Sequence, residues 1–464
     1  MMGPSQNPGS VRQVNENQCQ SCMPLGGVIT FKGIENAMAL VHGSQGCSTY
    51  MRLVNVEHYN EPVDIASSSL NEKQTIYGGE ANLKKALDNV IRVYAPKVIG
   101  VLTTCLAETM GEDLDRIILD YAKERSPGGI DVIPVPTPSY GGSHSEGFWA
   151  ATKAIIAYYA RPTEGHPRIN VIVPHISPAD IREIKRILTL MGLEYTLLPD
   201  FSMTLDRPYG GRYQKIPPGG TRTEDIARMP GAPLTIQFGE TCPDELSPGL
   251  WLQKEYGVPL VTLPLPVGIG AVDQLLEILE KITGRGMPEA LLTERGWLLD
   301  GMADAHKFNA EGRPVIYGEP ELVNAVTRMC LENGTVPAVI ATGSGNSRLA
   351  VSLEPLLAGI EDLPVLLEET DFFTIEGAAI RAGANIAIGH SGGKFFTERH
   401  GIPVIRIGFP IHDRIGGQRV LSTGYAGSLA FLDRLTNTLL ETKYSSYRQL
   451  RRDEMTRTNI PEGV

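Results

Sequence analysis

The chain is poor in aromatic residues, in positive charge and in long apolar runs. Phe, Trp and Tyr together make up 6% of its 464 residues, and its formal net charge is -11. A protein that binds nucleic acid through the phosphates needs a basic face, which this charge balance does not provide. No apolar run reaches the length of about 18 residues that a membrane-spanning helix needs. We therefore expect neither a nucleic acid nor a membrane among the partners of this protein.

Cysteine is scarce, and the start of the sequence has no pattern of a secretory signal. Residues 1–17 are polar and do not follow the basic-then-apolar order of such a signal, so we expect a cytoplasmic protein. In that reducing compartment the six cysteines are poor candidates for disulfides and better candidates for metal ligands or buried thiols.

The length of the chain and its periodicity predict several domains of one kind. A chain of 464 residues, 42% of them hydrophobic, is too long for one ordinary core. Short β-branched runs alternate with longer amphipathic stretches, which is typical of strand–helix–strand units around parallel sheets. We therefore predict an α/β protein of three Rossmann-like domains, with mostly parallel sheets flanked by helices. The predicted domains cover residues 1–162, 163–300 and 301–464, and the third ends in C-terminal helices.

The same patterns predict individual strands and helices. The expected strands cover Lys97–Leu102, Ile169–Pro174, Glu194–Leu198, Leu234–Phe238, Pro259–Leu263, Pro314–Tyr317, Ala338–Thr342, Leu363–Glu368, Ile386–Gly389 and Val404–Gly408. The expected helices cover Glu80–Tyr94, Gly111–Ala122, Ala179–Met191, Gly249–Tyr256, Glu321–Asn333, Thr374–Ala382 and Ala426–Glu441. Ligands of such sheets bind at the carboxyl ends of strands, so we expect the functional residues in the loops that follow them.

Three cysteines lie in glycine-containing loops of the first block. Cys22 stands in Cys-Met-Pro-Leu-Gly-Gly, Cys47 in His-Gly-Ser-Gln-Gly-Cys-Ser-Thr-Tyr, and Cys105 in Thr-Thr-Cys-Leu-Ala-Glu. Thiolates hold iron–sulfur clusters. Ser139 is a fourth candidate, because an alkoxide oxygen can bind iron when a cluster is oxidised. The alternative is that these cysteines are small buried hydrophobic residues, as free cysteine commonly is.

Glycines accompany two of the three cysteines, at positions 26 and 27 and at positions 43 and 46. Glycine lets the backbone approach a bulky inorganic core closely. The pattern therefore predicts that these four positions lie against a cluster.

The cysteine spacings are those of the β chains in the nitrogenase component 1 family, which the segment Cys22–Asp115 resembles. The resemblance continues through Ser67–Gly79, Thr137–His144 and Ile405–Arg414, and so covers almost the whole chain. The β-type members of this family include the molybdenum–iron protein β chain, its cofactor-assembly scaffold paralogue, and the β chain of nitrogenase-like reductases such as methylthio-alkane reductase.

This resemblance implies a role for each of the four candidate residues. Cys22, Cys47 and Cys105 would be ligands of a P-cluster (8Fe-7S), whose other three cysteines come from a homologous α-type subunit. Ser139 matches the serine that can bind the oxidised cluster. The chain would relay electrons from a separate ATP-hydrolysing iron protein to a metallocofactor, FeMo-type or all-iron, in the α-type subunit. The resemblance further implies an α2β2 assembly in which this chain does not bind the substrate.

Some features depart from molybdenum-nitrogenase β chains. The chain lacks their long N-terminal extension, and it reads Asn60-Glu61-Pro62 where they usually read Arg-Glu-Pro. The segment Asp64–Ser69 and the compact C-terminus resemble the scaffold paralogue and the nitrogenase-like reductases more closely. Many scaffold β-type chains, however, keep only the cysteine of the Gly-Ser-Gln-Gly-Cys loop and hold a smaller cluster (4Fe-4S). Because this chain keeps all three cysteines, we predict a reductase subunit, with methylthio-alkane reduction ahead of dinitrogen reduction and the assembly scaffold as the alternative.

The other cysteines and two histidines are weaker candidates. Cys19 forms a Cys-x-x-Cys with the first of the three cysteines, but zinc would need a second pair and none follows. Cys242 and Cys330 are expected to be buried thiols. His42 and His144, beside the cysteine loops, could tune a cluster or relay protons, or they could brace the loops through hydrogen bonds.

Overall fold

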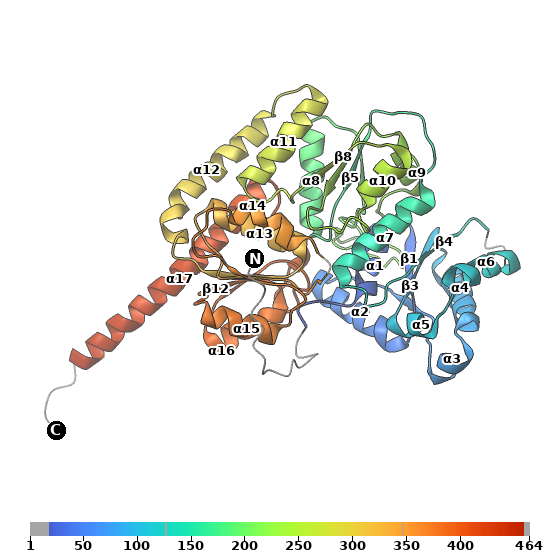
Figure 1. Ribbon diagram of the computed structural model, residues 1–464, viewed down its shortest axis with the longest axis horizontal. Helices are drawn as coiled ribbons and strands as arrows, with labels where there is room; N and C mark the ends of the chain where they lie inside the picture. The colour runs from blue at the N-terminus through green and yellow to red at the C-terminus, as the bar shows by residue number, and fades with distance from the viewer. Residues whose placement is uncertain (1–17, 126–127, 346, 459–464) are drawn as a thin grey trace.

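Three parallel β-sheets follow one another along the chain (Figure 1). The computed structural model describes residues 18–125, 128–345 and 347–458. The strands of each sheet come from one continuous part of the sequence, and helices connect them, as parallel pairing requires. This arrangement confirms the predicted α/β class, whereas the exact domain limits remain a prediction. Residues 1–17, on which the expectation of a cytoplasmic protein rests, lie outside the described residues.

The first sheet has the strand order β2-β1-β3-β4. Its strands are β1 (Ala37–His42), β2 (Ala66–Ser67), β3 (Val98–Thr103) and β4 (Asp131–Val135). Its helices are α1 (Met23–Lys32), α2 (Gln45–Tyr59), α3 (Glu72–Tyr77), α4 (Glu80–Tyr94), α5 (Cys105–Met110), α6 (Leu114–Arg125) and α7 (His144–Tyr159). Both β1 and β3 are buried along their whole length, as expected for apolar runs in the middle of a parallel sheet with helices on both faces.

The second sheet has the order β6-β5-β7-β8. Its strands are β5 (Ile169–Ile172), β6 (Tyr195–Leu198), β7 (Thr235–Phe238) and β8 (Leu260–Leu263). Its helices are α8 (Pro178–Leu190), α9 (Thr223–Ala227), the short 3-10 helix η1 (Met229–Gly231), α10 (Pro248–Tyr256), α11 (Ile269–Thr283) and α12 (Glu289–Asn309). Strand β6 is added on one side of β5, and β7 and β8 are added on the other side. The order of the strands therefore reverses between β5 and β7, which makes this place a topological switch point.

The third sheet has the order β11-β10-β9-β12-β13. Its strands are β9 (Pro314–Tyr317), β10 (Val339–Ala341), β11 (Val365–Leu367), β12 (Ile386–Gly389) and β13 (Val404–Arg406). Its helices are α13 (Pro320–Glu332), α14 (Leu349–Leu357), α15 (Phe372–Arg381), η2 (Ser391–Gly393), α16 (Phe395–His400), η3 (Gly417–Arg419) and α17 (Gly424–Thr458). Helix α17 packs along α12, and its far end projects from the body at the lower left of Figure 1.

Most predicted elements agree with the structure to within about three residues at each end. The exception is the last helix, which begins near the predicted start but continues to Thr458. The elements that were not predicted are three strands of the first sheet, β1, β2 and β4, and the helices α1, α2, α3, α5, α7, α9, α11, α12, α14 and α16. The sequence patterns therefore found the second and third sheets more completely than the first.

Two glycines bring α1 and α7 into close contact. A Cβ atom on Gly26 would overlap the backbone of His144, and one on Gly147 would overlap the backbone of Met23. Only glycine lets two helix backbones approach this closely. The contact holds the start of α1 against the start of α7, and so it fixes the position of the residue that precedes α1, Cys22.

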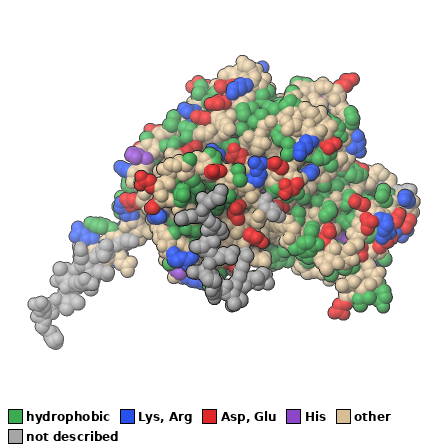
Figure 2. All heavy atoms as spheres, viewed as in Figure 1, with side chains coloured by type: hydrophobic (Ala, Val, Ile, Leu, Met, Phe, Trp, Pro, Cys, Tyr) green, Lys and Arg blue, Asp and Glu red, His purple; other side chains and the backbone are tan. Residues whose placement is uncertain are grey.

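Among the described helices, none combines the length and the apolar character that crossing a membrane requires. The face shown in Figure 2 carries acidic and basic side chains interspersed with one another and with apolar groups.

Candidate metal-cluster site

Three of the four predicted site residues follow neighbouring strands of the first sheet. Cys47 comes after β1 and lies in the first turn of α2, whereas Cys105 comes after β3 and is the first residue of α5. Ser139 lies in the loop after β4. Since β1, β3 and β4 are adjacent and parallel, their carboxyl ends meet at one edge, as predicted for a functional site of this fold.

Cys22 reaches the same edge from outside the sheet. It forms an isolated β-bridge with Ser143, and it occupies the N-cap position of α1. The backbone N–H of Met23 donates to Ser139 Oγ at 3.3 Å, which ties the start of α1 to the loop after β4. The structure thus brings together all four residues, and we call this group, Cys22, Cys47, Cys105 and Ser139, the cysteine edge.

Sulfur atoms of the cysteine edge accept hydrogen bonds from neighbouring residues. The backbone N–H of Ser139 donates to Cys105 Sγ at 3.2 Å, and Ser44 Oγ donates to Cys47 Sγ at 3.5 Å. The Ser139 hydroxyl hydrogen-bonds to the thiol of Cys22. Donors of this kind stabilise thiolates and tune the potential of a bound metal centre.

The three thiols also interact through charge. Partial desolvation raises the pKa of the Cys22 thiol, the hydrogen bond from Ser139 lowers it, and the nearby thiols of Cys105 and Cys47 raise it again. The sulfur atoms therefore lie close enough to repel one another once they are ionised. The N-termini of α1 and α2 offset part of this repulsion. A positively charged metal centre between the thiolates would offset the rest, so the donor set suits a metal cluster.

The cysteine edge opens to the surface of the chain. Cys22 is exposed, and Cys47 and Cys105 are half-buried. Two large aromatic residues beside them are also uncovered, since Tyr50 is 54% exposed and Tyr140 is 69% exposed. Burial raises the pKa of Tyr50 and the charge of Cys22 raises it further, which puts this ring next to the first thiol. An open thiol group with an apolar rim is typical of a surface that a partner covers.

The predicted role of the glycines is wrong at three of the four positions. A Cβ on Gly26, Gly27 or Gly43 would overlap the backbone of His144, the side chain of Leu102 or the side chain of Thr104, respectively, all within the protein. These three glycines allow close packing of the loops and helices that carry the thiols. Only Gly46 has open space around it, with Ser44 Oγ at 3.8 Å as the nearest atom.

Cys242 and Cys330 are buried, as predicted, and Cys19 is buried as well. Cys19, Cys242 and Cys330 are each at most 3% exposed, and burial raises the pKa of each thiol. None of the six cysteines forms a disulfide within the described residues. These three are therefore poor metal ligands, because the thiolate is the form that binds metal.

The two histidines beside the cysteine loops brace the structure through hydrogen bonds. His42 Nδ1 lies 2.9 Å from Ser68 Oγ, and its Nε2 lies 3.4 Å from Glu112. His144 Nδ1 accepts a hydrogen bond from the backbone N–H of Ser21, and its Nε2 lies 3.0 Å from Glu319. The bracing interpretation of both residues agrees with these contacts.

The sequence did not reveal a second group of polar side chains at the centre of the molecule. His175 follows β5, and Glu319 follows β9, so both lie just beyond the carboxyl ends of strands. That position is the signal that could have identified them. Their contact with His144 joins all three parts of the chain.

The comparisons with known proteins identify the family. The model of the nitrogenase component 1 type oxidoreductases matches residues 22–440. The chain belongs to this family. It is 35% identical over 429 residues to the nitrogenase molybdenum-iron protein beta chain of Clostridium pasteurianum, a match that covers 92% of this chain and 93% of that one.

Other members of the nitrogenase component 1 family support the same assignment. The nitrogenase vanadium-iron protein beta chain of Trichormus variabilis is 33% identical, with 91% of this chain and 93% of that one covered. The solved structure of nitrogenase Cp1 at pH 6.5 contains a chain with a TM-score of 0.89 and 34% identity, and the match covers 94% of this chain and 95% of that chain. The predicted resemblance to the β-type chains is thereby confirmed, and this chain is a subunit of an oxidoreductase.

Proposed function

We propose that Cys22, Cys47 and Cys105 bind a P-cluster (8Fe-7S) and that Ser139 binds to it when it is oxidised. The observation that carries this proposal is the convergence of the three thiols and the serine at one edge of the first sheet. Each residue arrives there from a different loop, and hydrogen bonds between the loops hold the arrangement.

The exposure of the cysteine edge supports a cluster that is shared with a second chain. Three thiolates leave a large iron–sulfur cluster incompletely bound, so the remaining ligands have to come from another protein. Exposed Tyr50, Leu53 and Tyr140 supply an apolar rim for that contact. We propose a homologous α-type subunit as the partner, in an α2β2 assembly located in the cytoplasm.

In this assembly the chain relays electrons. A P-cluster supplies redox chemistry without itself binding the substrate. The residues of this chain position the thiolates, donate hydrogen bonds to sulfur and, with the partner, exclude water from the site. Electrons would come from an ATP-hydrolysing iron protein and pass to a metallocofactor, FeMo-type or all-iron, in the α-type subunit.

The alternative function is the β-type chain of the cofactor-assembly scaffold, with a 4Fe-4S cluster. A smaller cluster needs fewer thiolates from this chain. We rank the relay ahead of the scaffold because the sequence keeps all three cysteines and the serine.

For the substrate, we propose methylthio-alkane reduction ahead of dinitrogen reduction. The support comes from the sequence, which reads Asn60-Glu61-Pro62 and resembles nitrogenase-like reductases over Asp64–Ser69. The two relatives named above carry nitrogenase names, so an assay has to offer both substrates and measure ammonia and the released thiol side by side.

The cluster can be tested by purifying this chain anaerobically with its natural partner, counting iron, and recording electron paramagnetic resonance spectra during stepwise oxidation. The relay predicts an eight-iron cluster that loses two electrons reversibly and is absent in Cys105→Ala. The matched control Cys242→Ala removes a buried thiol elsewhere and should keep the cluster. A four-iron signal in protein without turnover would support the scaffold, and iron-free protein would contradict both functions.

A further inference from the structure

A second group of ligand atoms lies at the centre of the chain, where the three sheets meet. His144 is the first residue of α7, beside the first sheet, while His175 follows β5 of the second and Glu319 follows β9 of the third. One imidazole nitrogen or carboxylate oxygen from each lies within 4.8 Å of the other two. We call these three residues the histidine junction.

Two atoms of the histidine junction are buried without a partner. Neither Nδ1 of His175 nor Oε2 of Glu319 has a hydrogen-bond partner among the described residues. Glu319 is only 6% exposed. A buried polar atom without a hydrogen-bond partner destabilises the fold, and more so when it is charged, so both atoms are candidates for binding a ligand.

The contacts that hold the His175 ring resemble those of a metal-binding histidine. Nε2 of His175 lies 2.9 Å from the hydroxyl of Tyr59, so Nδ1 is the ring nitrogen that has no partner among the described residues. Phe148 stacks on the His175 ring with centroids 5.7 Å apart and fixes its orientation. Metal-binding histidines commonly use their second nitrogen in this way, to set the ring and its tautomer.

The charges at the histidine junction favour a cation. Glu319 is buried, and its contact at salt-bridge distance within the described residues is the imidazole of His144. Within the described residues, no Lys or Arg forms an ion pair with Glu319. A buried carboxylate in such surroundings is stabilised by a positive ion.

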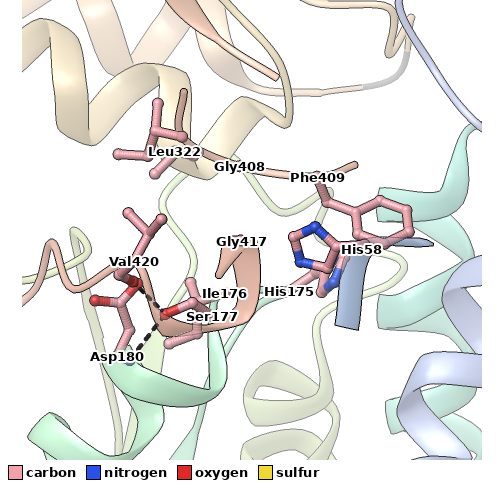
Figure 3. Close-up of a pocket in the computed structure, with 11 residues that line it drawn as sticks. His58, His175, Ile176, Ser177, Asp180, Leu322, Gly408, Phe409, Gly417 and Val420 are labelled. Carbon is pink, nitrogen blue, oxygen red and sulfur yellow. Dashed lines mark hydrogen bonds between the residues drawn. The ribbon is translucent and has the colours of Figure 1, made fainter. Parts of the chain in front are cut away.

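A small cavity lies beside one of the three residues, His175, and is not lined by the other two. A cavity of about 30 Å³ is lined by His175, His58, Asp180 and Phe409, among others (Figure 3). In Figure 3 the rings of His58 and His175 lie next to each other at one side of this cavity, with Phe409 above them. This volume accommodates one or two water molecules next to His175.

We propose that His144, His175 and Glu319 bind one divalent transition-metal ion, zinc or ferrous iron. Two imidazoles and a carboxylate are a common ligand set for both ions. Ligands bound to one tetrahedral ion lie about 3.3 Å apart, given metal–ligand distances of about 2.0–2.1 Å. The pair His144 Nε2 and Glu319 Oε1 is already 3.0 Å apart, and all three ligand atoms lie within 4.8 Å of one another.

Metal binding changes the tautomer of His144. In the metal-free geometry its Nε2–H donates to Glu319, at the place that the ion would take. On binding, that proton moves to Nδ1, and the hydrogen bond that Ser21 N–H donates there is lost. At 3.3 Å this is the longest hydrogen bond of the group, so its loss is a small cost.

The test uses crystals of the anaerobically purified complex of this chain with its natural partner. Anomalous difference maps are recorded above the zinc edge and between the iron and zinc edges, before and after incubation with one equivalent of zinc chloride. A peak between His175 and Glu319 in both maps identifies iron, and a peak only above the zinc edge identifies zinc. No peak in either map, with or without added zinc, overturns the proposal.

Matched variants connect the peak to these residues. Glu319→Gln keeps the shape of the side chain and removes its charge, whereas His306→Gln removes an exposed histidine of α12. Elemental analysis should show one metal equivalent fewer per chain in Glu319→Gln and no change in His306→Gln. Equal metal content in the wild type and Glu319→Gln contradicts the proposal. If Glu319→Gln does not fold, the wild-type maps decide alone.

Discussion

The cysteine edge and the histidine junction are built on the same principle but differ in exposure. Both groups lie just beyond the carboxyl ends of parallel strands, and both present ligand atoms toward one point. The cysteine edge faces outward, with Cys22 exposed, whereas two of the three residues of the histidine junction, His144 and Glu319, are buried and His175 is half-buried. We therefore propose that a second chain completes the open group, whereas the other group binds an ion with residues of this chain alone.

The largest expected effect on stability comes from substituting a glycine near the thiols. Gly26→Ala puts a Cβ into the backbone of His144, the residue that links the two regions, and should cost at least about 3 kcal/mol of folding free energy. Gly46→Ala meets open space and should leave the folded chain intact. Soluble yield and the thermal unfolding midpoint compare the two variants. Similar behaviour of both would contradict the packing role of Gly26.

The difference in exposure predicts a difference in thiol reactivity. In folded chain without a cluster, N-ethylmaleimide should modify Cys22, Cys47 and Cys105 on the order of 100-fold faster than the buried cysteines. The slow group consists of Cys19, Cys242 and Cys330. Peptide mapping by mass spectrometry gives the rates. In the complex with its cluster, the three fast-reacting cysteines should no longer react with N-ethylmaleimide. A uniform rate for all six would rule out the cysteine edge as an open site.

The buried histidines around the histidine junction predict a loss of stability in acid. Burial lowers the pKa of His58 to about 3, so this ring takes up a proton only after unfolding, once the pH falls below about 6.5. Stability is therefore present above about pH 6.5 and is lost as the pH falls toward 3. His58→Gln should shrink the difference in unfolding free energy between pH 7 and pH 5 by about 2 kcal/mol.

Denaturant unfolding of the purified chain at the two pH values measures this difference. The exposed His306 serves as the control, because His306→Gln removes a histidine that already contacts solvent. An unchanged difference in His58→Gln would show that His58 titrates alike in the folded and unfolded chain.

The smallest predicted effect concerns the serine of the cysteine edge. Ser139→Ala removes the acceptor of Met23 N–H and the hydroxyl that lowers the pKa of the Cys22 thiol. We expect a loss of about 1 kcal/mol in stability and an alkylation of Cys22 that shifts to higher pH. Ser44→Ala, which removes the donor to Cys47, should leave the pH profile of Cys22 unchanged. Identical Cys22 profiles in Ser139→Ala and the wild type would contradict the contact.

The sequence predicted the cysteine edge better than the histidine junction for a physical reason. Cys22, Cys47 and Cys105 each stand in a short motif, and parallel strands bring the loops after them to one edge. His175 and Glu319 stand in no motif, and they meet only because the second and third sheets pack against each other. Local patterns do not specify how sheets pack.

The same limit explains the errors in the fold. Strand β1 (Ala37–His42) is uniformly apolar and short, so its pattern does not separate it from a buried helix. Gly26 and Gly27 follow Cys22 closely in sequence, which favoured a cluster contact, yet they face α7 and β3. Whether a glycine packs against protein or against a ligand depends on the tertiary fold.

The central claim is that three thiols of this chain bind an iron–sulfur cluster that a second chain completes. An iron-edge anomalous map of crystals of the anaerobically purified complex tests it most directly. We predict compact iron density in contact with the sulfur atoms of Cys22, Cys47 and Cys105 that continues into the partner chain. Iron density on a single thiol, or none at the cysteine edge, would contradict the account.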